Sequence, residues 1–107
     1  HLMLSCLRAL KLPARYVSGY LLNAPPPGVE KLVGSDASHA WVESWLPGVG
    51  WVGFDPTNGK QANDEFITMA WGRDFMDVTP LRGVVLGGGN HELLVKVSVS
   101  KLAPESL

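Results

Sequence analysis

One histidine and one aspartate lie on two short segments that a tight turn separates. His39 lies near the start of residues 38–46, Asp55 lies near the end of residues 51–56, and the glycine-containing residues 47–50 join the two segments. A histidine that takes a proton and a carboxylate that orients the histidine are two of the three parts of a nucleophilic triad. The pair therefore indicates a base and an orienting acid, and the nucleophile is the part that still has to be found.

The hairpin register decides whether these two side chains meet. Side chains alternate between the two faces of a strand. If Leu46 pairs with Gly50, His39 lies diagonal to Asp55 on the same face, within reach of its side chain. If Leu46 pairs with Trp51 instead, the two side chains lie on opposite faces unless a bulge intervenes. A functional pair therefore requires the odd-length loop or a bulge.

Both residues also have an ordinary structural interpretation. A lone histidine on a half-buried strand is commonly a hydrogen-bonded structural residue. Asp55 precedes Pro56, and aspartate often caps a turn through its side chain. Tryptophans lie near both residues, and aromatic walls exclude water and strengthen an interaction between histidine and aspartate. This combination favours the functional interpretation of the pair.

The sequence predicts no metal site. His39 and Glu43 share a strand face, but they lie about 13 Å apart along the strand and cannot coordinate the same metal ion. His1 and His91 have no partners at a recognisable ligand spacing.

No cofactor is predicted either. The glycines at 87–89 lack the Gly-Lys-Ser/Thr ending of a phosphate-binding loop and fit the tip of a hairpin.

Cys6 is the single thiol of the chain, and it lies among leucines in the middle of a predicted helix. A reactive thiol needs a helix N-terminus or a cationic neighbour that lowers its pKa. Cys6 has neither obvious advantage, so a core position as a small hydrophobic residue is expected.

The residues that surround the pair predict an α+β domain. Residues 1–11 read as a helix that stops before Leu12-Pro13, and this helix should pack on a sheet through its leucines. Five or six antiparallel strands are expected, with a second hairpin formed by the last two segments. The predicted strands are residues 14–22, 38–46, 51–55, 66–71, 83–86 and 92–99, with a proline-rich loop at 23–36 and polar connections at 60–65 and 72–80.

Length and composition limit the classes of protein. A chain of 107 residues fits one domain, residues 1–107. The net charge is −1 and no basic stripe is visible, which argues against a nucleic-acid partner. No apolar run approaches the roughly 20 residues that span a membrane. The single cysteine fits a reducing compartment, and no signal peptide is visible, so a cytoplasmic location is expected.

Several runs resemble one known family, the bacterial transglutaminase-like domain. The runs are Leu12–Tyr20, His39–Glu43, Gly50–Asn58 and Gly72–Gly83. They occur in the family's order and span nearly the whole chain. The resemblance implies a papain-like α+β core with a Cys-His-Asp triad, and it carries the catalytic histidine onto His39 and the aspartate onto Asp55.

The family's nucleophile does not match a residue of this chain. It opens the helix in a run similar to Cys-x-Asp-x-Ala-His-Leu, and His1-Leu2 matches the end of that run. Cys6 falls at a later helix position. The apolar pattern of the helix is also present from the first residue, so the helix is expected to start upstream of His1. The chain is therefore expected to be the C-terminal part of a transglutaminase-like domain, inactive without its thiol.

The resemblance implies acyl transfer through a thioester, with protein or peptide amides as substrates. Water as the second substrate gives hydrolysis, and an amine gives crosslinking. The alternative is a non-catalytic module that uses the same fold to bind a protein or peptide.

Overall fold

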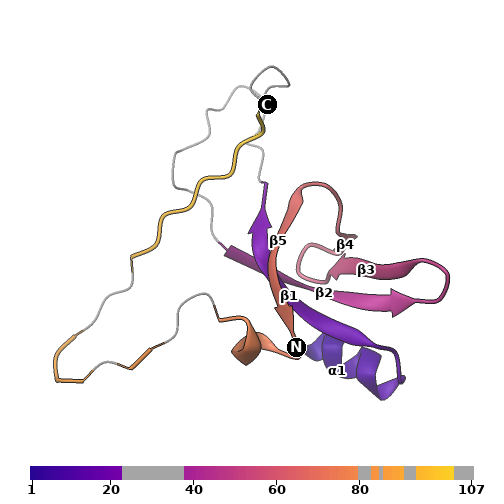
Figure 1. Ribbon diagram of the computed structural model, residues 1–107, viewed down its shortest axis with the longest axis horizontal. Coiled ribbons are helices and arrows are strands. Elements are labelled where there is room, and N and C mark those ends of the chain that lie inside the picture. The colour runs from indigo at the N-terminus through magenta and orange to yellow at the C-terminus, as the bar shows by residue number, and fades with distance from the viewer. Residues whose placement is uncertain (23–37, 80–82, 85, 91–93, 103–107) are drawn as a thin grey trace.

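The described part of the chain forms one α-helix, one short 3-10 helix and a five-stranded antiparallel sheet. The computed structural model (Figure 1) describes residues 1–22, 38–79, 83–84, 86–90 and 94–102. Its elements are α1 (Leu2–Ala9), β1 (Ala14–Leu21), β2 (Ser38–Leu46), β3 (Gly50–Asp55), β4 (Lys60–Gln61), β5 (Phe66–Gly72) and the short 3-10 helix η1 (Phe75–Asp77). The strand order is β4-β3-β2-β1-β5. The predicted α+β class and the antiparallel sheet are confirmed, and the papain-like core stays a prediction.

Helix α1 contacts the sheet along a narrow edge. Leu4 is 1% exposed, whereas Leu2 and Leu10 are 81% and 71% exposed. The predicted contact between the helix leucines and the sheet is therefore confirmed for Leu4 but not for Leu2 and Leu10. The predicted core position of Cys6 is wrong, because this thiol is exposed. Two residues advance a helix by about 200°, so Cys6 points away from the sheet that buries Leu4. In the described part of the chain, no helix is long and apolar enough to cross a bilayer.

Strand β1 is an inner strand of the sheet. It pairs with β2 on one side and β5 on the other, and its inward residues Val17 and Leu21 are buried. The β1–β5 register shifts between Ser18 and Gly19. A side chain at Gly19 would overlap the backbone carbonyl of Ile67, so only glycine permits this close approach of the two strands.

Charged side chains hold the connection after β5 in place. Asp74 accepts a hydrogen bond from the Met76 N–H at 2.9 Å. Arg73 donates to both carboxylate oxygens of Asp77, at 2.9 and 3.0 Å. These contacts shape η1 within the predicted polar connection. The next residue, Val78, is 7% exposed and belongs to the small core.

The predicted second hairpin is wrong for the residues that the structure describes. Among the described residues of the two predicted strands, 83–86 and 92–99, only Val97 forms a β-bridge and none lies in a strand. Val84, Leu86 and Leu94 are 87%, 92% and 77% exposed. Alternation identifies an apolar face, but a strand also needs a neighbouring backbone, and an isolated hairpin is marginal in water. The predicted turn at 60–65 instead includes β4, and the loop predicted at 23–36 lies outside the described residues.

Candidate active site

The β2–β3 hairpin adopts the register that brings His39 and Asp55 to one face. Leu46 pairs with Gly50, which leaves a three-residue loop. Gly50 has a φ of 101°, in the left-handed region that favours glycine. His39 is the second residue of β2 and Asp55 the last of β3, so the pair lies at one end of the sheet.

His39 and Asp55 form a direct hydrogen bond. Nε2 of His39 lies 2.8 Å from Oδ2 of Asp55, and the side chains are 21% and 0% exposed. Trp41 and Phe66 lie beside the imidazole, with ring centroids 6.2 and 6.3 Å away. Among the described residues, Nδ1 of His39 makes no hydrogen bond. Since Nε2 donates to the carboxylate, the neutral ring presents Nδ1 as a proton acceptor.

A turn holds the Asp55 carboxylate from its other side. Oδ1 accepts from the N–H groups of Thr57 and Asn58, at 3.1 and 3.3 Å, and Oδ2 accepts from the Asn58 side-chain amide at 2.6 Å. Burial alone would raise the pKa of Asp55, but the hydrogen bonds from Asn58 and His39 and the charge of His39 together lower it. Asp55 therefore caps a turn and also holds the histidine.

Asn58 is the contact that the sequence did not single out. It lies inside the Gly50–Asn58 run, but spacing alone does not show that its amide reaches back to Asp55. The turn-capping tendency of aspartate was the available signal, because such turns bring the residues two and three positions later to the carboxylate.

A cavity of about 320 Å³ lies beside the pair. It is lined by Tyr16, Ser18, Ser38, His39, Ala40, Thr57 and Phe75. The His1 ring stacks near Tyr16, with centroids 5.2 Å apart, and its Nε2 accepts from the Phe75 N–H at 3.2 Å. His1 therefore contacts two residues, Tyr16 and Phe75, that line the cavity beside His39. Burial raises the pKa of Tyr16, so this phenol stays neutral at physiological pH.

The other titratable candidates do not join this site. Cys6 is exposed on α1 and is not among the cavity-lining residues. Among the described residues, no three His, Cys, Asp or Glu side chains are grouped so that they could hold a metal ion.

Comparison with known proteins agrees with the resemblance in the motifs. Residues 1–56 match the family model described as the transglutaminase-like superfamily. An uncharacterised protein of Mycobacterium bovis is 40% identical over 99% of this chain, and one of Mycobacterium leprae is 42% identical over 96%. The chain spans only 35% and 36% of these two relatives.

A relative with a described activity matches a shorter stretch. A protein-glutamine gamma-glutamyltransferase of Pseudomonas aeruginosa is 50% identical over 54 residues, which are 48% of this chain and 8% of that protein. No solved structure matches the chain significantly.

Proposed function

The chain belongs to the transglutaminase-like superfamily, and from this membership we propose that it supplies the base and the orienting acid of a cysteine acyltransferase or amidase. His39 is the base and Asp55 the orienting acid. The observation that carries the proposal is the 2.8 Å contact between His39 Nε2 and the buried Asp55 carboxylate, which leaves Nδ1 open. The proposed substrates are protein or peptide amides.

The proposed reaction proceeds through a thioester. Nδ1 of His39 takes the proton of a cysteine thiol, and the thiolate attacks the amide carbonyl. The imidazolium then protonates the leaving amine or ammonia as the carbon–nitrogen bond breaks. Water or an amine, deprotonated by His39, attacks the thioester and releases the thiol. Asp55 holds the ring in the tautomer that keeps Nδ1 free and stabilises the imidazolium.

We place the nucleophile in the parent protein, just upstream of His1. Two observations support this position: His1-Leu2 resembles the end of the family's nucleophile run, and Tyr16 and Phe75 contact His1 while lining the cavity beside His39. Residues 1–107 would then form the C-terminal part of one transglutaminase-like domain. The 107-residue chain alone would have no acyl-transfer activity.

Alkylation of the parent protein's thiol tests His39 directly. In the parent protein, iodoacetamide should label the nucleophile well below pH 8, because a neighbouring imidazolium lowers a thiol pKa from its ordinary value of about 8.5. His39→Ala should remove this low-pH labelling and cut amide turnover at least about a hundredfold. Cys6→Ser is the matched control and should change neither rate. Unchanged rates in His39→Ala would remove His39 from the mechanism.

Two further results separate this proposal from its alternatives. Turnover by the purified 107-residue chain that is lost in Cys6→Ser would move the nucleophile to Cys6. A parent sequence without a cysteine upstream of His1 would overturn the enzyme and leave the non-catalytic peptide-binding module.

A further inference from the structure

The turned end of the β2–β3 hairpin is apolar and uncharged. Residues 45–51 include no charged side chain, and we call them the apolar tip. Trp45, Val49 and Trp51 are 45%, 72% and 39% exposed. Because neighbouring residues of a strand point to opposite faces, Trp45 and Leu46 place apolar side chains on both faces of the hairpin. Water therefore contacts apolar groups all around this end of the hairpin.

Stabilisation of the hairpin explains only part of this arrangement. The Trp45 and Trp51 rings pack edge to face with their centroids 5.7 Å apart, and such cross-strand aromatic pairs stabilise a hairpin. Val49 lies in the loop between the strands and contributes little burial, since most of its side chain is exposed. An apolar residue at this position gives the folded domain no evident benefit in water.

The backbone of the loop suits surroundings that are poor in water. The pairing of Leu46 with Gly50 leaves a loop of three residues, 47–49. Pro47 has no N–H group, and the Val49 N–H donates to the Leu46 carbonyl at 3.0 Å. Unpaired backbone donors are costly in lipid, and two of the three loop residues present none. The loop can therefore leave bulk water at a small cost in lost hydrogen bonds.

A second turn extends this apolar surface. The Trp45 N–H donates to the Pro13 carbonyl at 3.0 Å, so the turn between α1 and β1 lies next to the end of β2. In Figure 1 the end of α1 and the β2–β3 turn lie at the same side of the molecule. Leu10, at the start of the α1–β1 turn, is 71% exposed. Two neighbouring turns thus present apolar side chains in the same region.

The charge beside the apolar tip is positive. Lys11 is exposed in the α1–β1 turn. Neither α1, nor this turn, nor β1 contains an acidic residue. Glu43 of β2 pairs with Arg15 at 2.6 Å, so its charge is balanced. Tryptophan favours the interface between water and lipid, and a lysine at that depth attracts anionic lipid headgroups.

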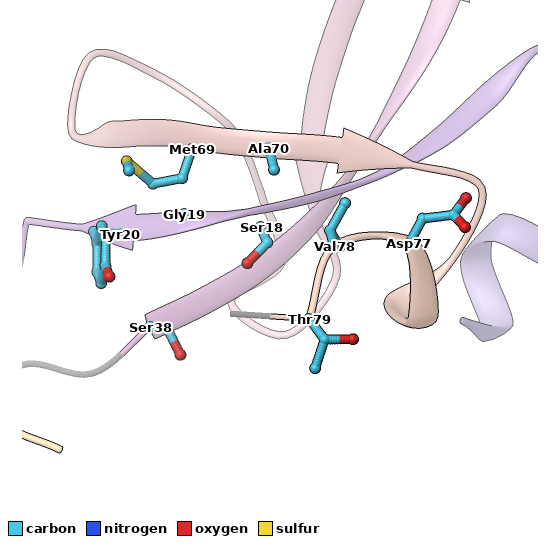
Figure 2. A pocket seen from close by; sticks show the side chains of 9 residues that line it. All are labelled: Ser18, Gly19, Tyr20, Ser38, Met69, Ala70, Asp77, Val78 and Thr79. Atoms are coloured by element: carbon cyan, nitrogen blue, oxygen red, sulfur yellow. The ribbon is translucent and has the colours of Figure 1, made fainter. Parts of the chain in front are cut away.

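The other end of β2 is polar. Ser38 begins the strand and lines a cavity of about 320 Å³, whose polar groups include the hydroxyls of Ser18 and Thr79 (Figure 2). His39 follows Ser38, and about 23 Å of extended strand separates His39 from Leu46. The apolar tip and the candidate active site therefore lie at opposite ends of one strand.

We propose that the apolar tip is a docking site for bilayers that contain anionic phospholipids. The tip enters the interfacial layer end-on, with Trp45 and Trp51 at the depth of the headgroups, and Lys11 pairs with lipid phosphates. Such docking is peripheral, because it uses the surface of the folded domain. It does not depend on the proposed reaction, and it holds His39 and Asp55 on the side that faces away from the lipid.

Vesicle binding by the 107-residue chain tests this site. The chain is mixed with vesicles of phosphatidylcholine, or of phosphatidylcholine and phosphatidylglycerol in equal amounts, and the bound fraction is measured by sedimentation. Binding to the mixed vesicles should move the tryptophan emission to shorter wavelength, and lipids brominated near the headgroup should quench it. Phosphatidylcholine vesicles should bind at least about fivefold more weakly, because Lys11 then lacks an anionic partner.

Two matched substitutions locate the contact. Val49→Glu places a charge on the apolar tip and should weaken binding to both kinds of vesicle at least about tenfold. Val84→Glu makes the same change in net charge at a side chain that is 87% exposed outside the tip, and it should leave binding nearly unchanged. Both replaced side chains are exposed, and near-ultraviolet circular dichroism checks that each variant folds.

A third substitution tests the electrostatic part of the site. Lys11→Gln should weaken binding to the mixed vesicles about fivefold and should leave binding to phosphatidylcholine unchanged. An equal loss on both kinds of vesicle would mean that Lys11 does not meet the anionic headgroups.

Four outcomes overturn the docking site. The first two are equal weakening by Val49→Glu and Val84→Glu, and tryptophan emission that neither shifts nor is quenched by brominated lipid. The third is self-association in light scattering without vesicle binding, which would make the tip a contact between two copies. The fourth is a parent protein that binds no vesicles and shields its tryptophans from acrylamide, because its own polypeptide would then cover the tip.

The docking site and the proposed function fail separately. His39→Ala should bind vesicles as the unmodified chain does, because His39 lies at the other end of β2. Loss of His39 dependence in amide turnover would overturn the mechanism and leave the docking site standing.

Discussion

At the scale of single residues, the site depends on how one carboxylate is held. Asp55 receives hydrogen bonds on both oxygens, and its side chain is fully buried. Such a carboxylate keeps its charge and its rotamer, so it can fix the orientation of His39. Alternation and loop length can predict that His39 and Asp55 meet. They cannot predict that the side-chain amide of Asn58 reaches Asp55, because that contact depends on the turn geometry after β3.

Replacing Asn58 should loosen the pair without removing it. Asn58→Ala deletes the 2.6 Å donor to Oδ2, so the pKa of Asp55 should rise and the free energy of unfolding should fall by about 1–3 kcal/mol. NMR titration of the Asp55 carboxyl carbon measures the first effect and urea unfolding the second. Asn63→Ala, which removes a cap from an exposed turn, is the control and should leave the Asp55 pKa unchanged. An unaltered Asp55 pKa in Asn58→Ala would show that the amide does not stabilise the anion.

At the scale of elements, one arginine connects four strands on the sheet face opposite α1. The Arg15 guanidinium lies 4.1 Å from the Trp51 ring centroid and 4.4 Å from that of Trp71. It also pairs with Glu43 at 2.6 Å. These side chains come from β1, β3, β5 and β2. The sequence predicted the strands, but this cluster depends on registers between strands that are distant in sequence.

Arg15→Lys should therefore destabilise the sheet although it keeps the charge. An ammonium cannot stack flat between two indole rings, and two exposed cation–π contacts contribute about 1–2 kcal/mol together. Urea unfolding of the variant should show a loss of that size. Arg73→Lys, at an ion pair whose arginine is 86% exposed, is the matched control and should cost less stability than Arg15→Lys. Equal losses in the two variants would mean that the stacking contributes nothing.

At the scale of the whole molecule, the predictions succeed where each strand has a neighbour. The first four predicted strands pair with one another in the sheet. Leu94 and Val95 have a comparable β-forming pattern, but the described residues around them form no strand and these side chains stay exposed. Local pattern therefore predicts strands better than it predicts their partners.

The free energy of unfolding of the whole chain in acid should depend on Asp55. The folded state lowers the pKa of this carboxyl below its ordinary value of about 3.9, so the folded state favours its charged form. The resulting stabilisation is complete above the unfolded pKa, and it is lost as the pH falls through the lower folded value. Asp55→Asn removes the charge and should remove this pH dependence, whereas the other carboxyls titrate alike in both proteins.

Urea unfolding of both proteins, followed by tryptophan fluorescence from about pH 2 to 8, measures the difference between their free energies of unfolding. That difference should shift in favour of Asp55→Asn as the pH falls from about 5 to 2, because the native carboxylate takes up its proton in this range. A difference that is independent of pH below about pH 5, or that moves in favour of the native protein in that range, would mean that folding does not stabilise the Asp55 anion. The orienting role proposed for this carboxylate would then lose its electrostatic basis.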